Sequence, residues 1–165
     1  MKSFKWAVVL AVGVAMGFAG GVFAAGAKKE MSISKAEDVK WTPLDPKDTE
    51  GKGPSVSVVF GDMKKKGAPV GFFLHVPADG KATPHTHTSE YYAVEVKGVE
   101  HNWDGGANEG PGIAPGGWWY QPGKQVHDNH CEKPTGECVA FIYMPNGFDF
   151  QPAKTAEKPA EKPSK

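Results

Sequence analysis

The sequence predicts an all-β fold, built as one small barrel or sandwich. Three observations predict it. From residue 55 onward, short runs rich in Val, Phe, Tyr and Trp recur at close intervals. Turns that contain Gly and Pro separate these runs. No helical period is present outside the first 25 residues. A length of 165 residues suits a single domain.

The predicted strands follow one another with a turn signal after most of them. Pro77-Ala-Asp-Gly80 ends one run, Lys133-Pro-Thr-Gly136 ends another, and a loop of Gly, Asn, Asp and Pro covers 104–117. The strands are expected at 56–60, 71–76, 83–87, 91–96, 99–103, 118–121, 125–131, 138–144 and 148–150.

The two ends of the chain have the composition of segments outside the domain. Lys2 and Lys5 precede an apolar run over 6–25, which predicts a signal peptide over 1–24, cleaved after Val22-Phe23-Ala24, and a periplasmic or secreted protein. Cleavage after Ala27 and a retained membrane anchor are the alternatives. After it come a polar N-terminal extension over 28–54 and the barrel domain over 55–150. Residues 151–165, with Ala-Glu-Lys-Pro occurring twice, are too polar to form a core and are expected to be a disordered tail.

The charge pattern disfavours one class of partner. The 19 basic residues balance 19 acidic ones, and all of the basic residues are lysine. Recognition of bases and phosphates relies heavily on the arginine fork, so nucleic acid is not an expected partner. Once the signal peptide is removed, no stable membrane insertion is expected either.

The segment Pro84-His85-Thr-His87-Thr-Ser-Glu90-Tyr91 predicts a metal site. Side chains alternate across a strand, so His85 and His87 face the same side and two imidazoles can meet at one ion. Two surface histidines next to a turn are the alternative that this segment leaves open.

Positions around these histidines resemble the two signatures of the cupin family, a double-stranded β-helix or jelly-roll barrel. His85, His87 and Gly98 fall on positions of the first signature, and Gly116, Pro122 and His127 fall on positions of the second. The resemblance implies a three-histidine metal site of His85, His87 and His127 at the mouth of the barrel.

The sequence departs from the cupin signatures at several positions. Tyr91 occupies the place of the usual glutamate ligand and Glu90 lies one residue away, so both are candidates for a fourth ligand or an acid/base group. By strand parity Tyr91 shares the face of the histidines, whereas Glu90 needs a bulge to reach it. In the second signature, Lys124 replaces a glycine and Cys131 replaces an asparagine.

Longer stretches of the chain resemble the cupin-like family DUF4437, which is related to the cupin domains of anti-sigma factors. They include Trp41-Thr-Pro-Leu-Asp-Pro46, Val59-Phe-Gly-Asp62, Gly71-Phe-Phe-Leu74 and His85–Tyr92. The resemblance implies a divalent transition metal (Fe, Mn, Ni, Cu or Zn), a small-molecule ligand or substrate, and a homodimer as the expected oligomer. Two functions stay open: a metal-dependent enzyme of the dioxygenase type, and a protein that binds or senses a metal or small ligand without turnover.

The two cysteines, Cys131 and Cys138, are expected to form a disulfide in an exported protein. If Pro134 and Thr135 form the tip of a hairpin, these cysteines lie directly opposite each other on neighbouring strands. Two reduced cysteines are the alternative, with Cys131 as a soft metal ligand.

Overall fold

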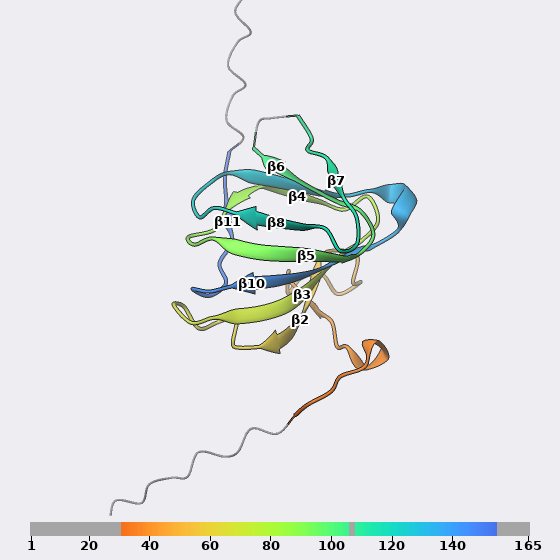
Figure 1. Cartoon of the computed structure of the whole chain (residues 1–165), viewed down its shortest axis with the longest axis vertical. Helices are drawn as coiled ribbons and strands as arrows, with labels where there is room; N and C mark the ends of the chain where they lie inside the picture. Colours follow the sequence, from red (N-terminus) through yellow and green to blue (C-terminus); the bar gives the residue numbers. More distant parts are fainter. Residues whose placement is uncertain (1–30, 106–107, 155–165) are drawn as a thin grey trace, which may run out of the picture. The chain divides into compact units, whose positions relative to one another are not determined.

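The computed structural model describes residues 31–105 and 108–154. The described residues from 34 onward form one unit, in which two antiparallel sheets pack face to face, as Figure 1 shows. One sheet has six strands in the order β1-β2-β3-β10-β5-β8, and the other has five in the order β11-β4-β9-β6-β7. The prediction of an all-β jelly-roll fold is confirmed.

The strands are short and are joined mostly by tight turns. Two 3₁₀ turns, Ala36–Asp38 and Lys133–Thr135, are the helical elements of the described residues. The strands are β1 (Thr42–Pro43), β2 (Ser55–Phe60), β3 (Val70–Val76), β4 (Lys81–Thr86), β5 (Tyr91–Lys97), β6 (Glu100–Asp104), β7 (Gly112–Ile113), β8 (Trp118–Gln121), β9 (His127–Cys131), β10 (Cys138–Met144) and β11 (Gln151–Pro152).

The core lies between the sheets because alternate residues of each strand point inward. In β5, Tyr91, Ala93 and Glu95 are buried while the residues between them are exposed, and β10 alternates in the same way. The main apolar cluster joins inward residues of the six-stranded sheet, among them Phe72, Trp119, Ile142 and Met144.

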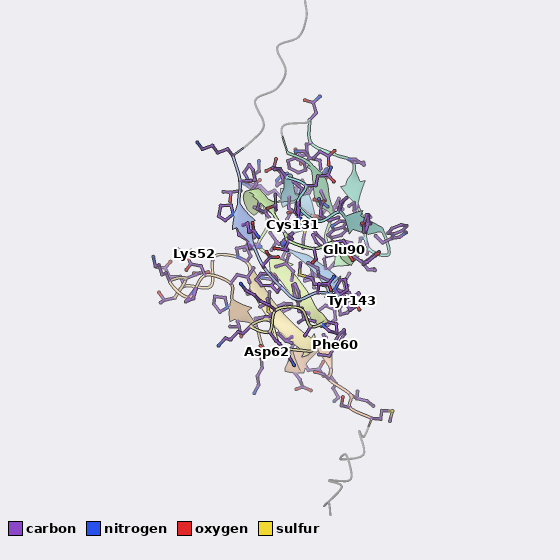
Figure 2. All side chains as sticks on the ribbon, turned by 90° about the vertical axis from the view of Figure 1, so that its left-hand side faces the viewer. Lys52, Phe60, Asp62, Glu90, Cys131 and Tyr143 are labelled. Carbon is purple, nitrogen blue, oxygen red and sulfur yellow. A yellow bond between two sulfur atoms is a disulfide. The ribbon has the colours of Figure 1, made fainter. Side chains whose placement is uncertain are left out.

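The outer face of the six-stranded sheet is also apolar. Tyr92, Val94, Tyr120 and Tyr143 are exposed on it. Figure 2 shows Tyr143 and Phe60 on neighbouring parts of this sheet, and their rings lie 6.2 Å apart.

The predicted disulfide between Cys131 and Cys138 is present, with 5.7 Å between the two Cα atoms. The expected hairpin is wrong, however. Cys131 ends β9 in the five-stranded sheet and Cys138 begins β10 in the six-stranded sheet, and a 3₁₀ turn lies between them. The bridge therefore ties one sheet to the other and is not a cross-strand pair within a ladder.

Near the C-terminal end of the described residues, one expected strand is wrong. Residues 148–150 are not a strand; the last strand is Gln151–Pro152, which pairs with Thr86 and His85 and extends the sheet beyond residue 150. In the expected N-terminal extension, Thr42 and Pro43 pair with β2. The predicted signal peptide and most of the predicted tail fall outside the described residues. Within the described residues, no helix has the length and apolarity needed to cross a membrane.

Candidate metal centre and cavity

The structure brings His85, His87 and His127 together in the interior. His85 lies on β4 directly opposite His127 on β9, and His87 follows the end of β4. All three are buried, and one ring nitrogen of each lies within 4.8 Å of one from each of the others. The ring centroids of His85 and His127 are 4.1 Å apart.

Backbone carbonyls orient the three imidazoles. Nδ1 of His85 donates to the carbonyl of Thr83 (2.8 Å), Nδ1 of His127 to that of Gln125 (3.2 Å), and Nδ1 of His87 to that of Asp149. A carbonyl only accepts, so each Nδ1 carries the proton and each Nε2 keeps its lone pair. This arrangement is the outer shell that metal-binding histidines usually have.

Burial keeps these imidazoles neutral. It lowers the pKa of His85 to about 4 and the pKa of His127 to about 3, and the neighbouring histidines lower both further. The pKa of His87 is also lowered by burial, against the opposing effect of the Asp149 carbonyl. Neutral imidazoles are the form that binds a metal, so the three residues fit a divalent transition ion.

Of the two candidates for a fourth group, Tyr91 lies beside the histidines and Glu90 does not line the cavity. The Tyr91 hydroxyl is 3.4 Å from Nε2 of His127 and accepts a hydrogen bond from Nε1 of Trp119 (3.2 Å). Burial raises the pKa of Tyr91, so its phenol carries its proton at neutral pH. Glu90 is half-buried just before β5.

Two positions of the cupin signatures have backbone reasons for their residue types. At Gly98 φ is +83°, and an added Cβ would lie 2.6 Å from the carbonyl oxygen of Glu137. Lys124, which stands where the signature has glycine, also has a left-handed backbone (φ 64°), and its N–H donates to the carbonyl of His87. The glycine-like conformation is thus kept although the glycine is not.

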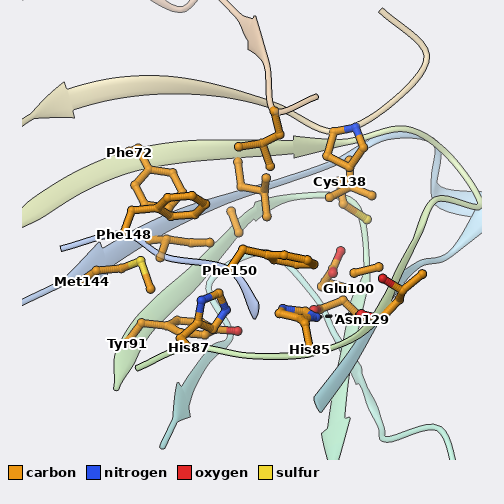
Figure 3. Close-up of a pocket in the computed structure, with 18 of the residues that line it drawn as sticks. Phe72, His85, His87, Tyr91, Glu100, Asn129, Cys138, Met144, Phe148 and Phe150 are labelled. Carbon is orange, nitrogen blue, oxygen red and sulfur yellow. Dashed lines mark hydrogen bonds between the residues drawn. The ribbon is translucent and has the colours of Figure 1, made fainter. Parts of the chain in front are cut away.

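A cavity of about 570 Å³ lies beside the histidines. Figure 3 shows His85, His87 and Tyr91 along one side of it, with Phe150 over the two histidines. Phe150 stacks on His85 with 4.4 Å between ring centroids. His127 does not line the cavity, so a molecule in the cavity would approach the three nitrogens from the side of His85 and His87.

The rest of the cavity wall is mainly apolar. It comes from both sheets, from the 148–150 segment and from Leu44 to Pro46, which follow β1. Its apolar residues include Phe72, Leu74, Val76, Ile142, Met144 and Phe148. A volume of this size with an apolar lining suits a small organic molecule.

A buried carboxyl, Glu100, also lines the cavity, and the sequence analysis did not single it out. It is 3% exposed and lies next to Asn129 in Figure 3. Burial raises its pKa to about 7, although His130, His101 and Asn129 act in the opposite direction. Glu100 shares inward parity with Asn102 on β6, and that run of inward polar residues is the sequence signal that could have indicated it.

Comparisons with known proteins agree with this architecture. The family model described as "Domain of unknown function (DUF4437)" matches residues 32–165. No curated protein matches the sequence.

Solved structures show the same fold at low identity. The polyketide cyclase RemF from Streptomyces resistomycificus has a TM-score of 0.59 at 16% identity, over 79% of this chain and 90% of that one. A cupin-2 domain protein from Rhodospirillum rubrum has a TM-score of 0.55 at 15% identity, over 76% and 82% of the two chains. The complex of Rhodobacter sphaeroides SigE with the anti-sigma ChrR matches with a TM-score of 0.51 at 15% identity, over 67% of this chain but only half of the other.

Proposed function

The chain belongs to the DUF4437 family and has a cupin fold, and from this premise we propose that it binds one divalent transition metal through His85, His87 and His127. The observation that carries the proposal is the common hydrogen-bond pattern of the three buried rings. Each commits Nδ1 to a backbone carbonyl and keeps the lone pair of Nε2, and one ring nitrogen of each lies within 4.8 Å of one from each of the others. Two nitrogens on one metal are at most about 4.2 Å apart, so a small inward movement closes the site.

We propose further that the cavity holds a small, largely apolar organic molecule next to the metal. Three histidines leave coordination positions open, and a metal bound there would supply Lewis-acid or redox chemistry. The apolar wall would hold the body of the molecule and exclude water. Glu100 and Asn129 are buried or half-buried polar groups of the wall that would receive a hydroxyl or amino substituent.

Two residues of this chain are placed to handle protons. A carboxyl with a pKa of about 7 can take up or release a proton at neutral pH, so Glu100 suits general acid–base work on the bound molecule. Tyr91 keeps its proton and would donate a hydrogen bond or act as a fourth ligand. These assignments favour a metal-dependent enzyme, including one of the dioxygenase type.

Export to an oxidising compartment is part of the proposal. The inter-sheet disulfide supports it, because such bonds persist outside the reducing cytosol.

The metal proposal is tested by elemental analysis and titration calorimetry on the purified protein. We expect one equivalent of metal in the parent and loss of tight binding in His127→Ala. His130→Ala is the matched control, since His130 lies on the same strand with the opposite parity and contacts Glu109 and Asp79 instead. Unchanged metal binding by His127→Ala would place the site elsewhere.

Turnover is tested by metal-dependent oxygen uptake with a panel of catechols and β-diketones. The enzyme proposal expects uptake that Glu100→Gln reduces without removing the metal. A bound metal with no turnover would favour the alternative, a protein that binds or senses a metal or small ligand.

A further inference from the structure

Cys131, Cys138 and Glu100 form a buried cluster that is separate from the three histidines. Glu100 and Cys131 are paired across β6 and β9, and Cys138 begins β10 in the facing sheet. The two Sγ atoms and a carboxylate oxygen of Glu100 lie within 4.8 Å of one another, and the three residues are at most 3% exposed. Among the described residues, only this cluster and the histidines bring three His, Cys, Asp or Glu ligand atoms so close together.

A second buried carboxyl lies near the cluster without a partner. Glu95 on β5 is paired with Ala140, which has the same inward parity as Cys138 two residues earlier on β10. Glu95 is 1% exposed, and neither of its carboxylate oxygens has a hydrogen-bond partner among the described residues. It is near enough to Glu100 for the charge of that residue to raise its pKa. Burying such a group without a partner is costly, and a cation bound in the cluster would offset this cost.

The cavity gives ions and small molecules access to the cluster. Cys138 and Glu100 both line the cavity, and Figure 3 shows them at the same end of it. Burial raises the pKa of Glu100 to about 7, so an ion can replace its proton at neutral pH. An ion or a reductant that enters the cavity therefore meets a ligand oxygen and one sulfur of the bridge.

We propose that the inter-sheet disulfide is a redox-controlled metal site, in which the reduced Cys131 and Cys138 bind a thiophilic divalent ion such as Zn²⁺ together with Glu100. A dithiol reductant gives two electrons and two protons to the Sγ–Sγ bond, which breaks to form two thiols while the dithiol becomes a cyclic disulfide. Zn²⁺ then replaces both thiol protons, which pass to the solvent. In the oxidised protein the sulfur atoms are bonded to each other, and no thiolate is present to hold the ion.

The ligand set of the cluster suits zinc. Zn²⁺ binds thiolates at about 2.3 Å and carboxylate oxygens at about 2.0–2.2 Å, in a tetrahedron whose ligand atoms are at most about 3.8 Å apart. Small movements within the cluster reach this geometry, and Glu95 or a water molecule would complete it. Because Cys131 and Cys138 belong to different sheets, the ion would keep the connection between the sheets that the disulfide provides.

The experiment compares oxidised and dithiol-reduced protein by titration with Zn²⁺ or Co²⁺, after the dithiol is removed under nitrogen. The cluster shares no residue with the histidines, so the His127→Ala protein is used and failure of the histidine site does not affect the result. We expect the reduced form to bind one equivalent of Zn²⁺ at least about 100-fold more tightly than the oxidised form. With Co²⁺, only the reduced form should show a thiolate-to-metal charge-transfer band in the ultraviolet.

Variants of the reduced protein identify the ligands. Changing both Cys131 and Cys138 to serine should remove the charge-transfer band, and Glu100→Gln should weaken Zn²⁺ binding at least about 10-fold. Glu132→Gln is the matched control, because Glu132 follows Cys131 in the chain but contacts His101 instead. This control should bind Zn²⁺ as tightly as its parent.

Equal Zn²⁺ affinities of the oxidised and reduced forms overturn the proposal. So does tight binding that Glu100→Gln leaves unchanged, since the two cysteines alone would then hold the ion. If reduction unfolds the protein, Zn²⁺ must restore the circular dichroism spectrum of the oxidised form, and failure to do so also overturns the proposal. Binding that requires reduction, weakens in Glu100→Gln and persists in Glu132→Gln supports it.

Discussion

Replacing Glu95 by glutamine should remove a strong pH dependence of stability. Glu95 is 1% exposed, and neither carboxylate oxygen has a hydrogen-bond partner among the described residues. Burial, with a smaller contribution from the charge of Glu100, raises its pKa to about 8. The unfolded chain ionises this group near pH 4.5, so between these values the unfolded state binds fewer protons than the folded one and stability falls as pH rises.

The size of the effect follows from the two pKa values. At 1.36 kcal/mol per pKa unit, Glu95 should lower the free energy of unfolding by about 3 kcal/mol more at pH 8 than at pH 5. Glutamine has the same shape and does not titrate. A buried amide without partners has its own cost, about 1–3 kcal/mol, but this cost is equal at both pH values. The quantity to measure is therefore the difference in unfolding free energy between variant and parent at pH 8, minus the same difference at pH 5.

The assay is urea unfolding followed by tryptophan fluorescence, with chelator present so that metal binding makes no contribution. Glu95→Gln should gain about 3 kcal/mol relative to the parent between pH 5 and pH 8. Glu50→Gln is the control, since the side chain of Glu50 is 67% exposed. If the variant and the parent change in parallel with pH, Glu95 is not a buried carboxyl with a raised pKa and the reasoning fails.

Three further predictions follow from the site and the fold. Tyr91→Phe should change the metal affinity or the colour of the iron- or copper-loaded protein more than Glu90→Gln does, because of these two residues Tyr91 lies beside the histidines. Calorimetry and absorption spectra measure the two effects, and a larger effect of Glu90→Gln would mean that Glu90 turns inward when metal binds. Changing both Cys131 and Cys138 to serine should lower the free energy of unfolding by about 2 kcal/mol or more, since the bridge joins the two sheets. Urea unfolding measures this loss. Two free thiols in the parent protein, found by alkylation without reductant, would contradict the bridge. Lys124→Gly should stabilise the protein by about 0.5–1 kcal/mol by relieving a left-handed backbone, and an unchanged or lower melting temperature would show that the lysine side chain compensates.

Local patterns were enough to identify the strands of four residues or more, and two of the three histidines of the site, but not the two-residue strands. Alternation along a strand depends only on neighbouring residues, and for that reason His85, His87 and the inward face of β5 could be predicted without knowing the sheet partners. His127 needed the resemblance to the cupin signatures, because no local pattern connects it to residues some forty positions earlier. The glycine-like conformation of Lys124 could not be predicted, since the residue type argues against it.

Only the tertiary structure decided which strands share a sheet, and the rest of the site depends on that. Sequence proximity suggested that β9 and β10 form a hairpin, but they lie in different sheets, so the disulfide has another role than expected. The same assembly places Glu100 in the cavity beside Asn129, and it brings Phe150 over His85 from a segment expected to be a strand. Strand periodicity is a local property set by the backbone, whereas sheet order, cavity lining and pKa values depend on contacts between residues far apart in the chain.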